Sequence, residues 1–142
     1  MNTSFKQLNV AWNADPNDPN PTIELDGEDL ILTFKLNAFQ YPQFTEGQTA
    51  RLRFNRYTAY RMGAPNDEGW YRGQCRFGKL APHWGDFYEV SGDLRLNLLN
   101  LPMNQKADGP PATRHFLFYL KDQTFECQAA DWSFHATGSP TY

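Results

Sequence analysis

Cysteine is scarce in this chain of 142 residues: only Cys75 and Cys127 occur, and neither forms a CxxC pair. A structural zinc site uses four closely spaced ligands, so the cysteines exclude a zinc-finger type of domain. Each cysteine lies in an alternating apolar pattern, next to Phe77 and Phe125 respectively. That setting favours a small core residue over a disulfide. A domain of this length can bury a core without covalent cross-links.

Long apolar runs and an excess of basic residues are also absent. No segment approaches the roughly 20 apolar residues that span a membrane. Residues 1–10 lack the charged region and apolar run of a signal peptide. A net charge of −3 argues against a dedicated binder of nucleic acid or anionic lipid, because both need a dominant basic surface. We therefore expect a cytoplasmic protein with no membrane partner, and nucleic acid is an improbable ligand.

Motifs that carry catalytic chemistry are missing too. The chain has no phosphate-binding loop, no dinucleotide fingerprint and no nucleophile elbow. His83, His115 and His135 are far apart in the sequence, and a metal site needs at least three converging donors. We expect neither a metal nor an organic cofactor, and a binding domain rather than an enzyme.

Aromatic residues, by contrast, are plentiful at 15% of the chain, and ten glycines and ten prolines divide it into short segments. Aromatic side chains favour strands. This pattern predicts one all-β domain over residues 1–142, with a core at about residues 5–136. We expect eight or nine mostly antiparallel strands in a β-barrel or a β-sandwich. The barrel would be lipocalin-like and the sandwich jelly-roll-like, by architecture alone.

The strongest local signal is a hairpin near the C-terminus. Residues 116–120 are apolar on both alternating faces, which predicts a strand buried on both sides. Residues 124–129 alternate between apolar and polar side chains and predict its partner. The apolar phase shifts by one residue at Ala129-Ala130, and we expect a β-bulge there within one last strand.

Three other segments have clear signals. Asp26-Gly27 predicts a tight hairpin turn before a strand at residues 30–36. The alternation of Leu8, Val10 and Trp12 predicts a first strand. Residues 102–113 have no periodicity and predict a surface loop.

Charge is distributed unevenly, because six of the eight arginines lie between residues 51 and 76. They are Arg51, Arg53, Arg56, Arg61, Arg72 and Arg76. Arg51 and Arg53 share a strand face, as do Arg72 and Arg76. If the turn at residues 66–69 joins the two strands, four guanidinium groups line one sheet face.

Two interpretations of that hairpin remain open. With Trp70 and Tyr71 at its rim, it could bind an anion or a stacked base weakly. Alternatively, the acidic block that includes Glu24 and Asp26 pairs with the arginines and neutralises the face. We favour the second.

Glu89 and Glu126 are the candidate acid/base residues. Both lie in predicted strands and could face a common cavity, where burial beside Tyr119 would raise a carboxyl pKa. The alternative is an exposed position or an ion pair with Arg114 or Arg95. These residues support a second hypothesis, a small barrel enzyme that uses a buried carboxylate.

Tryptophans next to glycines near turns are candidates for a ligand-binding surface. Trp70 and Trp84 have this setting, although packing in the core is the default role of such rings. We therefore expect a non-catalytic domain that binds a small molecule or a protein partner. An unprotected edge strand could also pair two copies as a homodimer.

Overall fold

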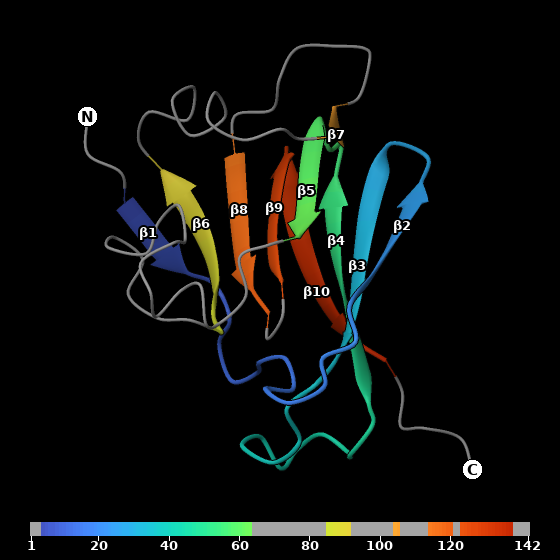
Figure 1. The fold of residues 1–142 in the computed structure, drawn as a ribbon, viewed down its shortest axis with the longest axis vertical. Coiled ribbons are helices and arrows are strands. Elements are labelled where there is room, and N and C mark those ends of the chain that lie inside the picture. Colours follow the sequence, from blue (N-terminus) through green and yellow to red (C-terminus); the bar gives the residue numbers. More distant parts are fainter. Residues whose placement is uncertain (1–3, 64–84, 92–103, 106–113, 121–122, 138–142) are drawn as a thin grey trace.

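A computed structural model describes residues 4–63, 85–91, 104–105, 114–120 and 123–137 of the chain. These residues form ten strands, more than the eight or nine expected, and no helix, so the all-β prediction is confirmed for them (Figure 1). None of them forms a helix long and apolar enough to cross a membrane. The strands are β1 (Ser4–Gln7), β2 (Thr22–Asp26), β3 (Asp29–Lys35), β4 (Thr49–Asn55), β5 (Ala59–Gly63), β6 (Phe87–Ser91), β7 (Asn104–Gln105), β8 (Arg114–Tyr119), β9 (Thr124–Ala129) and β10 (Asp131–Ala136).

The strands make two separate antiparallel sheets (Figure 1). One sheet has six strands in the order β1-β6-β8-β9-β5-β7, and the other has four in the order β10-β4-β3-β2. Among the described strands, each sheet has two edge strands of its own, and none belongs to both sheets. A closed barrel has no edges, so the barrel alternative is wrong.

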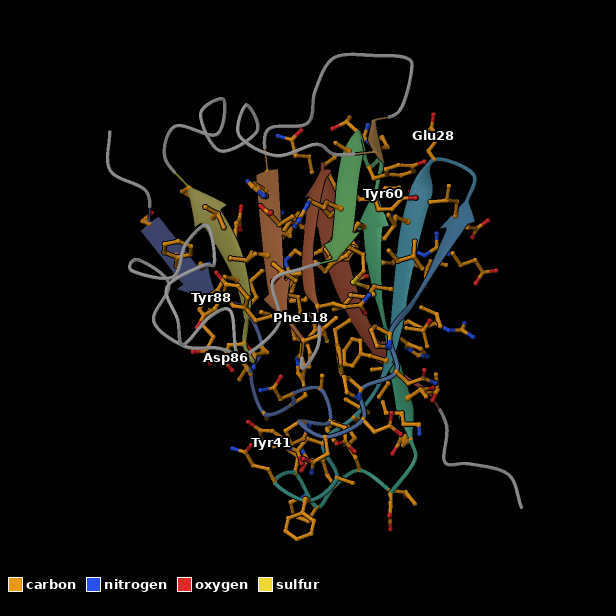
Figure 2. All side chains as sticks on the ribbon, viewed as in Figure 1. Glu28, Tyr41, Tyr60, Asp86, Tyr88 and Phe118 are labelled. Carbon is orange, nitrogen blue, oxygen red and sulfur yellow. The ribbon has the colours of Figure 1, made fainter. Side chains whose placement is uncertain are left out.

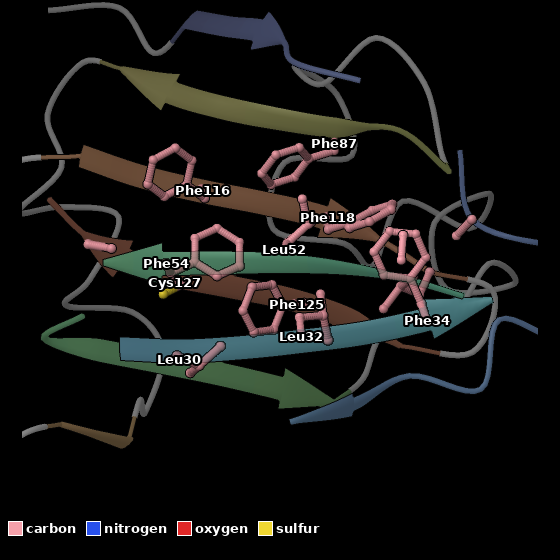
Figure 3. Close-up of a cluster of buried hydrophobic side chains, with 14 of the residues drawn as sticks. Leu30, Leu32, Phe34, Leu52, Phe54, Phe87, Phe116, Phe118, Phe125 and Cys127 are labelled. Atoms are coloured by element: carbon pink, nitrogen blue, oxygen red, sulfur yellow. The ribbon is translucent and has the colours of Figure 1, made fainter. Parts of the chain in front are cut away.

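Aromatic side chains fill the space between the sheets (Figure 3). Phe54 on β4 is fully buried and lies 5.3 Å from Phe116 on β8 and 5.4 Å from Phe125 on β9, measured between ring centres. The two inner faces therefore build one shared core. Deleting a phenylalanine of this kind costs a protein about 3–5 kcal/mol.

The C-terminal hairpin forms as predicted. β8 pairs with β9 from Arg114 opposite Ala129 to Tyr119 opposite Thr124. Both faces of β8 are buried, as its apolar run predicts. The alternating strand β9 is buried on both faces as well, although one of them is polar.

The predicted bulge at Ala129-Ala130 is wrong, because the chain passes there from one sheet to the other. β9 ends at Ala129, β10 begins at Asp131, and the Ala130 N–H donates to the carbonyl of Asn55 at 2.9 Å. Side chains on both strands point into the shared core, but from opposite sides. A corner between sheets shifts the apolar phase by one residue just as a bulge does.

The predicted first strand at residues 8–12 is also wrong. The chain there is irregular, with Ala11 at a φ of 59° and Val10 78% exposed. Trp12 is buried and stacks on Phe134, with ring centres 4.4 Å apart. Hydrogen bonds of the Asn9 side chain replace a strand ladder: its Oδ1 accepts from Phe87 N at 3.1 Å.

The hairpin at Asp26-Gly27 is confirmed, since β2 and β3 pair from Asp26 opposite Asp29. Gly27 has a φ of 61°, which a two-residue hairpin loop of this kind requires. Within the predicted loop at 102–113, residues 104–105 pair with β5 as strand β7. The rest of that loop lies outside the described residues.

Candidate functional site

The arginine hairpin does not form around Arg51 and Arg53. Their strand, β4, pairs with β3 along one edge and with β10 along the other, at nearly every residue. No edge of β4 remains for a partner strand, so the predicted pairing is wrong. Four residues of that surface, Trp70, Tyr71, Arg72 and Arg76, lie outside the described part of the chain, as does Trp84.

Arg53 is neutralised by the acidic block, as predicted. Its Nη2 is 2.8 Å from Asp26 and its Nη1 is 2.5 Å from Asp29. Burial acts to raise the pKa of Asp29, but hydrogen bonds from Arg56 N–H, Arg53 and Asn55 together lower it. Arg51 is exposed between Thr33 and His135 on the neighbouring strands. The outer face of the four-stranded sheet is therefore largely a solvated surface with paired charges.

Glu89 forms an ion pair with Arg114, which was one of the two expected alternatives to a catalytic role. Arg114 donates to both of its carboxylate oxygens, at 2.9 Å and 2.8 Å, and reaches Asp131 at 2.9 Å. The Arg114 guanidinium lowers the pKa of Glu89 through these hydrogen bonds. Glu89 thus stays ionised and is unsuited to act as a general acid.

Glu89 and Glu126 do not share a cavity. Glu89 lies opposite Phe116 on β8, whereas Glu126 lies opposite the next residue, Leu117. Opposite residues in a ladder share a face and neighbouring residues alternate. The two carboxylates consequently project from opposite faces of the six-stranded sheet.

The outer face of β8 and β9 carries a buried polar pair. Glu126 Oε1 lies 2.9 Å from His115 Nε2, and the side chains are only 2% and 0% exposed. Thr124 and Gln128 flank Glu126 on the same face of β9 and are also buried. Arg61 on β5 lies opposite Glu126 in the ladder. Sequence reasoning identified Glu126 but missed His115 as its partner.

Tyr119 lies on the same face as this pair, in a small apolar cluster. Its ring meets that of Tyr88 edge-on, with ring centres 6.4 Å apart, and Val90 and Leu117 complete the cluster. The candidate residues Glu126 and Tyr119 are therefore brought to one buried face. A histidine–carboxylate pair of this kind can position a proton for acid/base chemistry, or simply satisfy two buried polar groups.

A second, open site lies at one end of the sheets. A cleft of about 570 Å³ is formed by the loops before β2 and after β3. Its lining residues are Asp15, Pro16, Asn17, Asp18, Leu36, Asn37, Ala38, Phe39, Gln40, Phe44, Glu46 and Gly47. Tyr41, in the second of these loops, marks this end of the molecule in Figure 2, far from Glu28.

Backbone hydrogen bonds hold the walls of the cleft. Asp15 N donates to the Lys35 carbonyl and Asn37 N to the Asn13 carbonyl, both at 2.8 Å. On the other wall, Leu36 N donates to the Gln48 carbonyl at 2.8 Å. These bonds tie both loops to the end of β3, so the cleft exists before any ligand arrives.

Side-chain hydrogen bonds shape each loop. Asp15 Oδ1 accepts from the backbone N–H of Asn17 at 2.8 Å and of Asp18 at 3.1 Å. Asn37 Oδ1 accepts from Gln40 N at 3.0 Å. Aspartate and asparagine stabilise turns in this way, and the prolines between residues 16 and 21 prevent a strand.

The cleft is acidic, with an exposed aromatic residue. Three carboxylates belong to its lining, and among the lining residues that the structure describes none is basic. Lys35, from outside the lining, pairs with Asp18 at 2.9 Å. The Phe39 side chain is completely exposed to solvent. Sequence reasoning missed this site, because its loops are separated in the sequence and meet only through the pairing of β3.

Metal ligands do not gather in the described segments: no three His, Cys, Asp or Glu residues there lie close enough to share an ion. Comparisons of the chain with protein families, with curated proteins and with solved structures give no match.

Proposed function

We propose that this protein is a non-catalytic binding domain whose ligand occupies the cleft between residues 15–18 and 36–47. The observation that carries the proposal is the combination of a preformed hollow of about 570 Å³ with a fully exposed phenylalanine in its lining. Binding sites are typically concave and largely apolar, with a few polar groups that orient the ligand.

The anchoring of the walls supports this function. A ligand that orders a flexible loop loses part of its binding free energy to that ordering. Here the hydrogen bonds at Asp15, Leu36 and Asn37 fix both loops in advance. Exposure of an apolar side chain as large as Phe39 to water is unfavourable. A partner that covers the ring would bury this apolar surface and thereby gain binding free energy.

A second candidate function is acid/base catalysis on the outer face of the six-stranded sheet. The observation that favours it is the 2.9 Å contact between His115 Nε2 and Glu126 Oε1, with both side chains buried. Glu126 and Tyr119 would be the catalytic residues and His115 the group that orients the Glu126 carboxyl group. Glu89 is not a candidate, because Arg114 holds it as a carboxylate.

Protein nuclear magnetic resonance (NMR) tests the binding proposal. A library of small fragments is titrated into ¹⁵N-labelled protein, and the shifted amide signals are mapped onto the sequence. We expect the shifts to concentrate in residues 15–18 and 36–47 and to decrease in a Phe39→Ala variant, with Leu25→Ala as the exposed control. Shifts concentrated around His115 and Glu126 would favour the catalytic alternative and contradict the proposal.

The architecture, the cellular location and the oligomeric state of the protein complete this proposal. We infer that the two sheets form a β-sandwich, since rings from both meet in one core. A cytoplasmic location and a homodimer paired through an edge strand stay predictions. In the described residues the available edges are those of β1, β7, β2 and β10.

A further inference from the structure

We infer that the ligand of the cleft is a peptide segment that presents a lysine or arginine beside an apolar side chain. The inference rests on the proposed binding function and names the partner of that site. Two properties of the cleft, its charge and its exposed apolar surface, select this class of partner.

The charge of the lining selects a cation. Asp15, Asp18 and Glu46 contribute three carboxylates, and none of the described residues of the lining is Lys, Arg or His. Lys35 pairs with Asp18 and also interacts with the charge of Asp15, so one cation faces these two carboxylates while Glu46 stays apart. Glu46 forms no ion pair with any residue that the structure describes. Complementary charge steers a partner toward such a surface and discriminates against a partner of the same sign.

The aromatic ring of Phe39 can contact both a cation and an apolar group. A lysine or arginine placed over the face of a ring gains a cation–π interaction, which acts together with the nearby carboxylates. The rest of the ring is available for apolar contact, since the side chain is entirely exposed.

Exposed surface continues beyond the cleft, which favours a peptide over a small amine. Gln43 Nε2 donates to the Ala11 carbonyl at 2.8 Å and so joins the loop after β3 to the segment before β2. That segment carries Val10, which is 78% exposed and does not belong to the cleft lining. A second hollow of about 250 Å³ shares Asn17 and Asp18 with the cleft, so an extended segment has space to continue beyond the cleft.

Fluorescence anisotropy with two labelled probes tests the inference. One probe is a short peptide in which lysine alternates with leucine, and the other is its twin with glutamate in place of lysine. The native chain is compared with Glu46→Gln and Phe39→Ala. The matched controls are Glu28→Gln and Leu25→Ala, which change an exposed carboxylate and an exposed apolar residue elsewhere.

We expect the lysine probe to bind and the glutamate probe not to bind. Glu46→Gln should weaken the lysine probe by about fivefold and Phe39→Ala by about tenfold, the usual sizes of a lost exposed charge contact and a lost aromatic contact. The two controls should leave binding unchanged. Binding that the controls weaken as much as the cleft variants would overturn the inference, because general attraction to an acidic protein would then explain it.

The result also separates this inference from the function on which it rests. If Phe39→Ala weakens both probes equally, or only the glutamate probe binds, the cationic partner is wrong while binding at the cleft stands. If neither probe binds but fragments still shift the amides of residues 36–47, the peptide is wrong and the cleft remains a site for another ligand. If fragments do not shift those amides either, both the inference and the proposed function are wrong.

Discussion

The candidate functional side chains of this molecule lie in two regions, one buried and one exposed to solvent. On the outer face of β8 and β9, His115 and Glu126 are shielded from water and contact each other. At the loop end, Glu46 and Phe39 stand in solvent on walls that backbone hydrogen bonds already hold. Replacing a polar group in the first region should lower stability strongly, whereas replacing the exposed Glu46 or Phe39 in the second should affect the fold little. A binding surface has the second property.

The largest expected effect comes from breaking the buried pair. Glu126→Ala removes the 2.9 Å contact with the imidazole of His115 in a site closed to water. We expect the free energy of unfolding to fall by about 3–5 kcal/mol, as in other buried pairs that lose one partner. Urea unfolding followed by circular dichroism measures it.

Replacing both partners is the control for that experiment. His115→Leu combined with Glu126→Met exchanges the pair for apolar side chains of similar size, which is often neutral for stability. The double variant should regain most of the loss. If it is no more stable than Glu126→Ala, the loss does not come from breaking the contact between these two side chains, and the role assigned to that contact is wrong.

A smaller loss of stability is expected from substitution of Asn9, whose side chain connects the N-terminal segment to the beginning of β6. Asn9 is buried; its Oδ1 accepts from Phe87 N, and its Nδ2 donates to the Trp12 carbonyl at 3.2 Å and to Asp86 at 3.1 Å. Asn9→Ala leaves these groups unsatisfied and should cost about 1–3 kcal/mol. Thermal unfolding of the Asn9→Ala variant is compared with that of Asn17→Ala, which removes an exposed asparagine and should change stability little. Equal losses of stability in the two variants would contradict the role assigned to Asn9.

Acid should weaken the fold through Glu89 and Asp29. The pKa of each lies below its ordinary value, 4.5 for the glutamate and 3.8 for the aspartate. A lowered pKa in the folded state stabilises the protein above the ordinary value, and this contribution disappears as pH falls through the folded-state pKa. Urea midpoints should therefore drop as pH falls from about 5 to about 3.

The matched variant for this acid effect is Glu89→Gln, which removes one titrating group. Its urea midpoint should depend less on pH over the same interval than that of the native chain. Glu28→Gln, at an exposed turn, should leave the dependence intact. An unchanged slope in Glu89→Gln would contradict the role assigned to the pair with Arg114.

The smallest expected effect on stability is at the cleft. Phe39 is fully exposed and Glu46 is exposed without an ion pair among the described residues. Phe39→Ala and Glu46→Gln should each change the free energy of unfolding by less than about 0.5 kcal/mol. A larger decrease in the free energy of unfolding, measured by urea unfolding, would mean that these side chains contribute to the stability of the fold and would contradict a role in binding only.

Local patterns predicted the elements that depend on neighbouring residues. The hairpin of β8 and β9 and the turn after β2 follow from short-range alternation and from Gly27, so both were predicted. The ion pair of Glu89 with Arg114 was one of two alternatives, and only the ladder between β6 and β8 decides between them.

Features that depend on distant strands could not be predicted. A one-residue phase shift at Ala130 fits a bulge and a corner equally well, and the choice depends on the partner of β10. The pairing of β4 with β10 likewise ruled out the arginine hairpin. The cleft needs residues 15–18 and 36–47 to meet, and no local pattern contains that contact.

The central claim is that ligand binding belongs to the loop-end cleft and that the buried pair serves the fold. The most direct test is the NMR titration repeated on the double variant His115→Leu, Glu126→Met, with a fragment that shifts the amides of residues 36–47 in the native chain. Distant sites without shared partners act independently, so the affinity should stay within about twofold of the native value. Loss of fragment binding in a double variant that remains folded would contradict the account, because it would make the buried pair part of the functional site.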